Sequence, residues 1–223
     1  MITVKSVTKY SCNEHVTKVA RMNSETIAQK LIKYNEFFSI THNFSINILP
    51  VKKDTVTSYD QFIASMPTPF KMAADMSSID QAALRPLQAL SGVANQLVEF
   101  LNHQSKKIDL LIGYILKQED DEEFRYQGLK FGGGGLLFTA QKKFELTQLL
   151  EMKVFLQNEN YAVYCYGEII DIEQVENDYL HKVIFHFIRE DDREVLVRTS
   201  LHEQSKQLQA LALRRNNEEK DNK

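Results

Sequence analysis

The sequence contains a run of four glycines, Gly132 to Gly135, within FGGGGLLF. Consecutive glycines let backbone amides cradle a phosphate when a helix begins directly after them. A strand-like stretch, LLFTA, follows here instead, and the sequence contains neither GK[ST] nor a GxGxxG at a strand-to-helix turn. The run therefore predicts a glycine-rich β turn and not a nucleoside-triphosphate or dinucleotide site.

The residue types that act as bases, nucleophiles or metal ligands are scattered along the chain. None of the six histidines forms HxxxH with an acid, and His181 and His186 lie five apart in a predicted strand, hence on opposite faces of it. Cys12 and Cys165 make no CxxC spacing. The acidic run Glu119 to Glu123 lacks the alternating ligands and the glycine of a calcium loop, so it predicts a solvated connector. We expect a non-catalytic protein with no metal and no cofactor.

Four tyrosines in the second half of the chain could stack on nucleic-acid bases, but acidic residues surround them. Glu168, Asp171 and Glu173 would repel a phosphate backbone. The whole chain carries a formal net charge of -3 and has a pI near 6.1. We therefore expect no nucleic-acid partner and assign the tyrosines to core and cross-strand packing. They are Tyr161, Tyr164, Tyr166 and Tyr179.

The composition indicates a folded protein of the cytoplasm. Hydrophobic residues make up 43% of the 223 residues, which is enough to build one large core or two small ones. The first residues lack the apolar stretch of a signal peptide, and no apolar run approaches the ~18 residues that span a bilayer. The two cysteines lie in unrelated segments, which fits a reducing compartment. We expect a cytoplasmic protein without membrane insertion.

The most regular pattern in the chain is a heptad repeat between residues 87 and 115. Apolar residues recur every seven positions, and a second set follows three positions after the first, like the a and d positions of a coiled coil. Pro86 suits the beginning of a helix. We predict that this seam is an oligomerisation surface. Its a positions are Leu87, Ala94, Leu101, Ile108 and Ile115, and its d positions are Leu90, Leu97, Gln104 and Leu111.

Such a helix would extend about 43 Å, too far for one small domain to cover its apolar face. Flanking positions such as Phe100 and Tyr114 are also apolar, which favours a bundle of three or four helices over a dimer. Gln104 within the seam would fix the register. We predict a homo-oligomer, a tetramer in preference to a trimer. The other interpretation is that residues 1–80 of the same chain cover this face.

The patterns on either side of this helix divide the chain. Before it, a helix over Ser24 to Phe38 and a strand FSINILPV, ending at Pro50, precede a linker. After it, the strand-like stretches LLFTA, MKVFLQ, YAVYCYGEIIDI and HKVIFHFI lie too close together for parallel crossovers, so an antiparallel sheet or small barrel is expected. A last helix runs from Glu190 to about Arg215. The predicted segments are an N-terminal α/β segment with its linker at 1–70, the oligomerisation helix at 79–118, and a β-barrel with its C-terminal helix at 124–215.

Three motifs follow one another from Phe131 to about Leu201: a glycine turn, a G-x-I strand and an E-x-D-R-x-x-L helix. In order and spacing they resemble a PilZ domain, in preference to an unrelated small barrel. The resemblance implies an α+β fold, with a C-terminal six-stranded antiparallel barrel, a long coiled-coil helix and a small mixed N-terminal segment. The matching residues are Gly134, Gly135 and Leu136, then Gly167, Glu168 and Ile169, then Glu190, Asp192, Arg193 and Leu196.

The long helix and its acidic connector resemble an atypical PilZ branch, whose members carry an extra heptad-repeat helix and can tetramerise. Ligand-binding PilZ domains hold cyclic di-GMP with RxxxR before the barrel and (D/N)xSxxG at its first turn. Aligning the final glycine on Gly135 puts Lys130 and Gly132 at the acid and serine positions, and upstream Arg125 stands without a second arginine. The resemblance thus implies a degenerate site at Arg125, Lys130, Gly132 and Gly135, and no cyclic di-GMP binding.

Together these patterns predict a non-catalytic, oligomeric PilZ-like adaptor or regulatory protein. The resemblance implies a role in bacterial signalling, type IV pilus or motility regulation, through a protein partner that the sequence does not identify. The alternative is a cyclic di-GMP receptor that binds through non-standard residues. Those residues would be Arg125, Lys130, Lys142 or Lys143.

Overall fold

The computed structural model describes residues 27–52, 56, 58–73, 93–156 and 161–221. Residues 27–36 and 68–73 are helical as well as the elements that follow. In chain order these are β1 (Ser39–Val51), α2 (Tyr59–Ser65), α4 (Val93–Lys117), the 3-10 turn η1 (Glu122–Phe124), β2 (Arg125–Gly132), β3 (Gly135–Ala140), β4 (Leu149–Leu156), β5 (Tyr161–Val175), β6 (Asp178–Phe187) and α5 (Glu190–Asp221).

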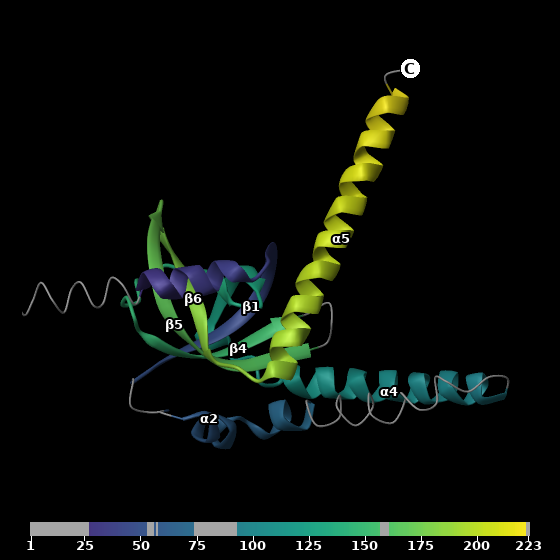
Figure 1. Cartoon of the computed structure of the whole chain (residues 1–223), viewed down its shortest axis with the longest axis horizontal. Coiled ribbons are helices and arrows are strands. Elements are labelled where there is room, and N and C mark those ends of the chain that lie inside the picture. The colour runs from purple at the N-terminus through teal and green to yellow at the C-terminus, as the bar shows by residue number, and fades with distance from the viewer. Residues whose placement is uncertain (1–26, 53–55, 57, 74–92, 157–160, 222–223) are drawn as a thin grey trace, which may run out of the picture.

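The six strands form a closed antiparallel barrel in the order β1-β2-β3-β6-β5-β4 (Figure 1). The predicted six-stranded antiparallel barrel is therefore confirmed. Alternate side chains point inward and fill the barrel, so that closure leaves no strand edge free. The fully buried side chains of this first core include Ile46, Phe131, Phe138, Leu150 and Val183.

The placement of the barrel entirely within residues 124–215 is wrong, because β1 belongs to the barrel. Ser45 pairs with Gln127 of β2 on one side and with Phe155 of β4 on the other, so β1 closes the gap between those two strands. The strand also continues through Pro50 to Val51, at its end, where a proline is tolerated. The barrel is thus central in the chain, and part of the N-terminal segment is one of its walls.

A second core lies outside the barrel, on the outer face of β4 and β5. The ring of Phe62 in α2 stacks on Tyr164 at 5.9 Å between centroids, and its edge meets Tyr166. Phe70 of the helical turn 68–73 and Leu116 near the end of α4 are buried in the same cluster. The packing role predicted for Tyr164 and Tyr166 is therefore confirmed, and it joins two helical segments to the barrel wall.

Two long helices extend away from the barrel, α4 to one side and α5 at a steep angle to it (Figure 1). The described part of the predicted helix 79–118 runs from Val93 to Lys117. Leu87 and Leu90 lie outside the described residues, as does the side chain of Ala94. Among the described helices, none combines the length and apolar character that crossing a membrane requires.

Candidate functional site

The predicted oligomerisation seam of α4 carries large apolar side chains that face solvent. Leu97, Ile108, Leu111 and Ile115 are between 37% and 65% exposed, while Leu101 and Gln104 are half-buried. Phe100 and Tyr114, one position before Leu101 and Ile115, are exposed too and widen the stripe. Exposed apolar surface of this extent on one helix typically marks an interface. We call this surface the α4 seam.

The barrel covers a different face of α4, and only near the end of the helix. Leu116 is buried in the outer core, and with Gly113 it borders a small apolar cavity shared with Phe155 and Ala162 of the barrel wall. At 100° per residue, positions 112, 113 and 116 lie on the side of the helix away from Leu111. Docking onto the barrel therefore holds the end of α4 in place, and among the described residues it leaves Leu97, Ile108, Leu111 and Ile115 exposed.

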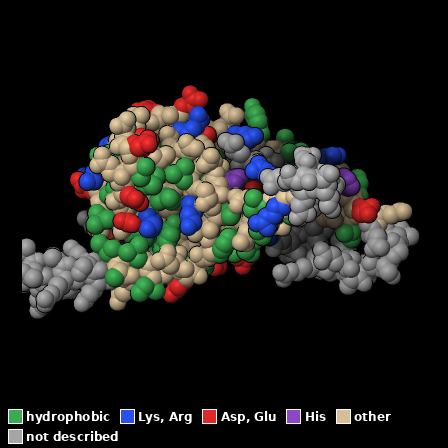
Figure 2. Space-filling model, turned by 90° about the horizontal axis from the view of Figure 1, so that it is seen from above, with side chains coloured by type: hydrophobic (Ala, Val, Ile, Leu, Met, Phe, Trp, Pro, Cys, Tyr) green, Lys and Arg blue, Asp and Glu red, His purple; other side chains and the backbone are tan. Residues whose placement is uncertain are grey.

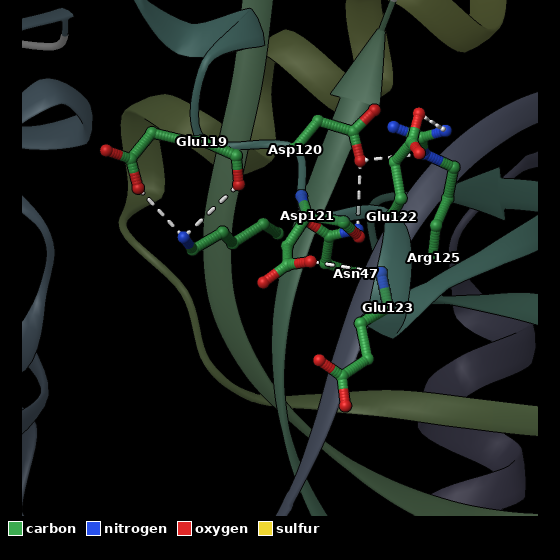
Figure 3. A network of polar contacts seen from close by, with 8 residues as sticks. Asn47, Glu119, Asp120, Asp121, Glu122, Glu123 and Arg125 are labelled. Carbon is green, nitrogen blue, oxygen red and sulfur yellow. Dashed lines mark hydrogen bonds and ion pairs between the residues drawn. The ribbon is translucent and has the colours of Figure 1, made fainter.

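The acidic run after α4 is a structural joint between α4, β1 and β2 (Figure 3). Asn47 of β1 is buried, and its Nδ2 donates to Asp120 Oδ1 and to the Asp121 carbonyl, both at 2.9 Å. Its Oδ1 accepts from the Asp121 amide at 2.8 Å. Lys153 of β4 pairs with Glu119 at 2.8 Å. Within the described residues, no cluster of three or more His, Cys, Asp or Glu could hold a metal ion.

Arg125, at the start of β2, is engaged by this acidic joint. Its Nε donates to Asp120 Oδ1 at 3.0 Å, and its Nη1 lies 3.4 Å from Glu122 Oε1. The hydrogen bond to Asp120 is the main cause that raises the pKa of Arg125 above its ordinary value. The guanidinium is therefore already paired with carboxylates, and an incoming phosphate would have to displace them.

The glycine turn between β2 and β3 is covered by side chains of the protein itself. Tyr34 and Phe37 pack so closely that a Cβ on Gly133 or Gly134 would crowd them, and a Cβ on Gly135 would collide with the Val183 carbonyl. Tyr34 is only 6% exposed, and burial raises its pKa to about 12. The predicted β turn is confirmed, and its glycines serve the close approach of the preceding segment.

Side chains of α5 also cover this glycine turn. Arg193 donates to the Gly133 carbonyl, and its guanidinium carbon lies 5.5 Å from the centre of the Phe37 ring. Val197 of the same helix also reaches Gly133. The turn is therefore held between the N-terminal segment and the first turns of α5.

The predicted nucleotide positions do not converge in the structure. Arg125 and Gly132 begin and end β2, which places them about 23 Å apart along the strand. Lys130 lies between them and is half-buried, opposite Thr41 and Leu137. Only Gly132 and Gly135 share one location, at the covered turn.

No protein-family profile and no curated protein matches the chain. Among solved structures, a tetrameric PilZ domain from Xanthomonas campestris, described as self-assembled via a helical bundle, matches with a TM-score of 0.50 at 11% identity. The match covers 79% of this chain and 95% of that one. The barrel and its helices are PilZ-like in fold.

Two further structures share less of the fold. The Bacillus subtilis inhibitor of motility MotI/DgrA matches with a TM-score of 0.35 at 14% identity, and MrkH of K. pneumonia with 0.32 at 12%. These matches cover 37% and 39% of this chain. The chain spans 42% of the first protein and 44% of the second, less than half of either.

The PilZ-like barrel begins at Ser39, so the described residues directly in front of it are 27–38, and Arg125 lies within the barrel at the start of β2. This segment contacts the glycine turn through Tyr34 and Phe37. It contains Lys30 and Lys33 but no arginine. Lys30 is paired with Glu168 at 2.7 Å. The sequence patterns did not show that β1 is the first strand of the barrel. The alternating apolar residues of FSINILPV indicate this strand in the sequence.

The stretch E-x-D-R-x-x-L at the start of α5 fastens this helix to the barrel. Asp192 is fully buried, accepts from Arg189 Nε at 2.7 Å and from the Tyr161 hydroxyl at 2.9 Å. Arg189 also donates to the Phe70 carbonyl at 3.1 Å. Burial raises the pKa of Asp192, and the hydrogen bond from Arg189 opposes that rise. These contacts join α5, β5 and residues 68–73, so the motif is structural.

Proposed function

We propose that this chain is a non-catalytic, PilZ-like regulatory adaptor that assembles into a homo-oligomer through the α4 seam. The observation that carries the proposal is the exposure of the apolar heptad positions Leu97, Ile108, Leu111 and Ile115, on a helix that is docked on the barrel near its end by another face. The fold likeness to a PilZ domain that forms tetramers through a helical bundle supports the same arrangement.

A tetramer uses this surface better than a dimer does. The exposed stripe includes Phe100 and Tyr114 beside the a and d positions, and a two-stranded seam would leave both rings in water. Four chains would bring four barrels together around one bundle. Each barrel then offers an outer surface to a protein partner in bacterial signalling, type IV pilus or motility regulation in the cytoplasm.

Light scattering on the intact chain tests the assembly. We expect an oligomer for the wild type and a monomer for the Leu97→Asp, Leu101→Asp variant, because two charges in a buried seam lack partners. Leu110→Asp is the matched control. Leu110 is 60% exposed and adjacent to the seam residue Leu111, but it occupies a c position, so its variant should keep the oligomer. A monomeric wild type at micromolar concentration would show that the assembly proposal is wrong.

We also propose that the barrel does not respond to cyclic di-GMP. The glycine turn is filled by Tyr34 and Phe37, and the described residues in front of the barrel, 27–38, include no arginine. Arg125 lies at the other end of β2 among carboxylates. Paired arginines recognise guanine edges and phosphates through bidentate hydrogen bonds, and no such pair is formed by the described residues.

A calorimetric titration with cyclic di-GMP checks this second proposal. We expect no heat of binding for the wild type at micromolar ligand. The competing function, a receptor using Arg125, Lys130, Lys142 or Lys143, predicts saturable low-micromolar binding that is lost in Arg125→Ala or Lys142→Ala. The observation that favours this alternative is the position of Lys142 and Lys143. Both are exposed in the loop after β3, and each lies near an aromatic ring.

A further inference from the structure

Helix α5 has a docked half and a free half. Leu196, Thr199, Ser200 and Glu203 are buried against the rest of the chain, and Gln207 donates to the Thr41 carbonyl of β1 at 2.9 Å. From Gln207 to Arg215 every side chain is exposed. Figure 1 shows this part of α5 projecting beyond the barrel. Figure 2, a view from above, shows basic and acidic side chains interspersed over the barrel. The free half therefore needs its stability from elsewhere, since short isolated helices are marginal in water.

The exposed side of α5 has a heptad seam of its own. Leu201 and Leu208 are seven residues apart, and Leu211 follows three later, so they occupy a, a and d positions. All three are between 50% and 59% exposed. Gln204 occupies the d position between the two a leucines and is half-buried, as Gln104 is in α4. We call this surface the α5 seam.

The two seams repeat one sequence. Residues 101–111 read LNHQSKKIDLL and residues 201–211 read LHEQSKQLQAL. Both follow the pattern L-x-x-Q-S-K-x-[I/L]-x-x-L, with the single seam glutamine in the same place. The barrel-facing positions of the two helices differ, so the shared pattern lies at the seam positions and in a Ser-Lys pair at the e and f positions. Contact with the barrel does not require this repeat.

A shared seam pattern lets the two helices pack on each other in register. The leucine and isoleucine positions form apolar layers, and a glutamine amide in such a bundle is satisfied best by another amide in its own layer. Pairing Gln104 with Gln204 provides one. Within one chain the seams cannot meet in this way, because α4 and α5 diverge from the barrel (Figure 1). The partner must be a second copy.

We propose that the α5 seam packs against α4 of a second copy of this chain, with Gln204 in the same layer as Gln104. The bundle then contains α5 as well as α4, and each chain contributes two seams to it. This inference rests on the proposed assembly through α4 and specifies what else covers that helix.

Disulfide trapping in the full-length chain tests this contact. In a Cys12→Ser background, where the remaining Cys165 is buried, differently tagged chains carrying Gln104→Cys or Gln204→Cys are mixed, exchanged and mildly oxidised. We expect a crosslinked species that contains both tags. Lys106→Cys with Lys206→Cys is the matched control pair, because these residues occupy the same places in the repeat but face away from the seam. That pair should stay uncrosslinked.

The outcomes separate this inference from the proposal on which it rests. If light scattering shows an oligomer but only 104–104 or 204–204 crosslinks form, α5 does not pack on α4 and this inference alone is overturned. If the wild type is monomeric, both are overturned. Equal crosslinking of the control pair would show random collision and would also overturn the contact.

A second pair of variants checks the α5 seam without cysteines. Leu211→Asp should raise the concentration at which the oligomer half-dissociates by roughly tenfold or more. Leu213→Asp makes the same substitution two residues later, at an exposed f position outside the seam, and should leave that concentration within about twofold. Circular dichroism verifies that both variants fold. Equal behaviour of the two variants would contradict the contact.

Discussion

At the scale of single residues, His181 is the polar group whose environment has the clearest consequence. It is fully buried in the barrel, where its Nε2 accepts from the Phe144 amide at 3.2 Å. Its ring stacks on Phe138, with 4.8 Å between the ring centroids. Burial is the main cause that lowers the pKa of His181 below 6.5, so folding disfavours the protonated imidazole.

This environment predicts a loss of stability in mild acid. Below about pH 6.5 the unfolded chain binds a proton at His181 that the folded chain does not, so the free energy of unfolding falls as the pH is lowered. The fall continues until the pH passes the lowered pKa of the folded state. His181→Leu should reduce this dependence, and at about pH 7.5 it should cost about 1–3 kcal/mol because the Phe144 amide loses its acceptor.

Urea unfolding at about pH 7.5 and about pH 5 measures both effects. His202→Gln, on the exposed side of α5, is the control and should leave the difference between the two pH values unchanged. If His181→Leu retains the full loss of stability in acid, another group causes it.

At the scale of elements, the helices and strands with a regular sequence pattern were predictable. The order in which the strands pair to close the barrel was not. The seven-residue period predicted α4, and the period-two stretches predicted β3, β4, β5 and β6. The strand β2 was not predicted, because RYQGLKFG combines polar side chains with a glycine. The glycine, Gly128, leaves room for the ring of Phe44, which would collide with a side chain there. Packing of that kind joins residues far apart in the chain, and sequence periodicity carries no record of it.

The candidate sites divide in the same way. The apolar α4 seam follows from local spacing, and the exposure of Leu97, Ile108, Leu111 and Ile115 agrees with it. The nucleotide positions depended on knowing which segment precedes the barrel, and that knowledge requires the pairing of β1 with β2 and β4. Tyr34 and Phe37 gave no motif that could have revealed their place over the glycine turn.

At the scale of the whole molecule, the barrel requires β1. The sequence patterns assign this strand to the N-terminal segment 1–70, outside the predicted barrel segment 124–215. Fragment 124–215 lacks β1, so β2 and β4 would each expose an unpaired edge. It also lacks Phe44, Ile46 and Ile48, which are buried in the barrel core. Each large apolar side chain withheld from such a core costs about 1.5–3 kcal/mol, and three of them amount to much of a domain's stability.

We therefore expect fragment 124–215 to show no cooperative thermal unfolding by circular dichroism, whereas the full chain does. Adding fragment 27–73, which supplies β1 together with the helical segments that pack on Tyr164, should restore a transition. The same fragment with Ile46→Asp and Ile48→Asp is the matched control and should fail, because both side chains must enter the barrel. A cooperative transition in fragment 124–215 alone would mean that the remaining five strands can close without β1, and that β1 is an addition to the barrel instead of part of it.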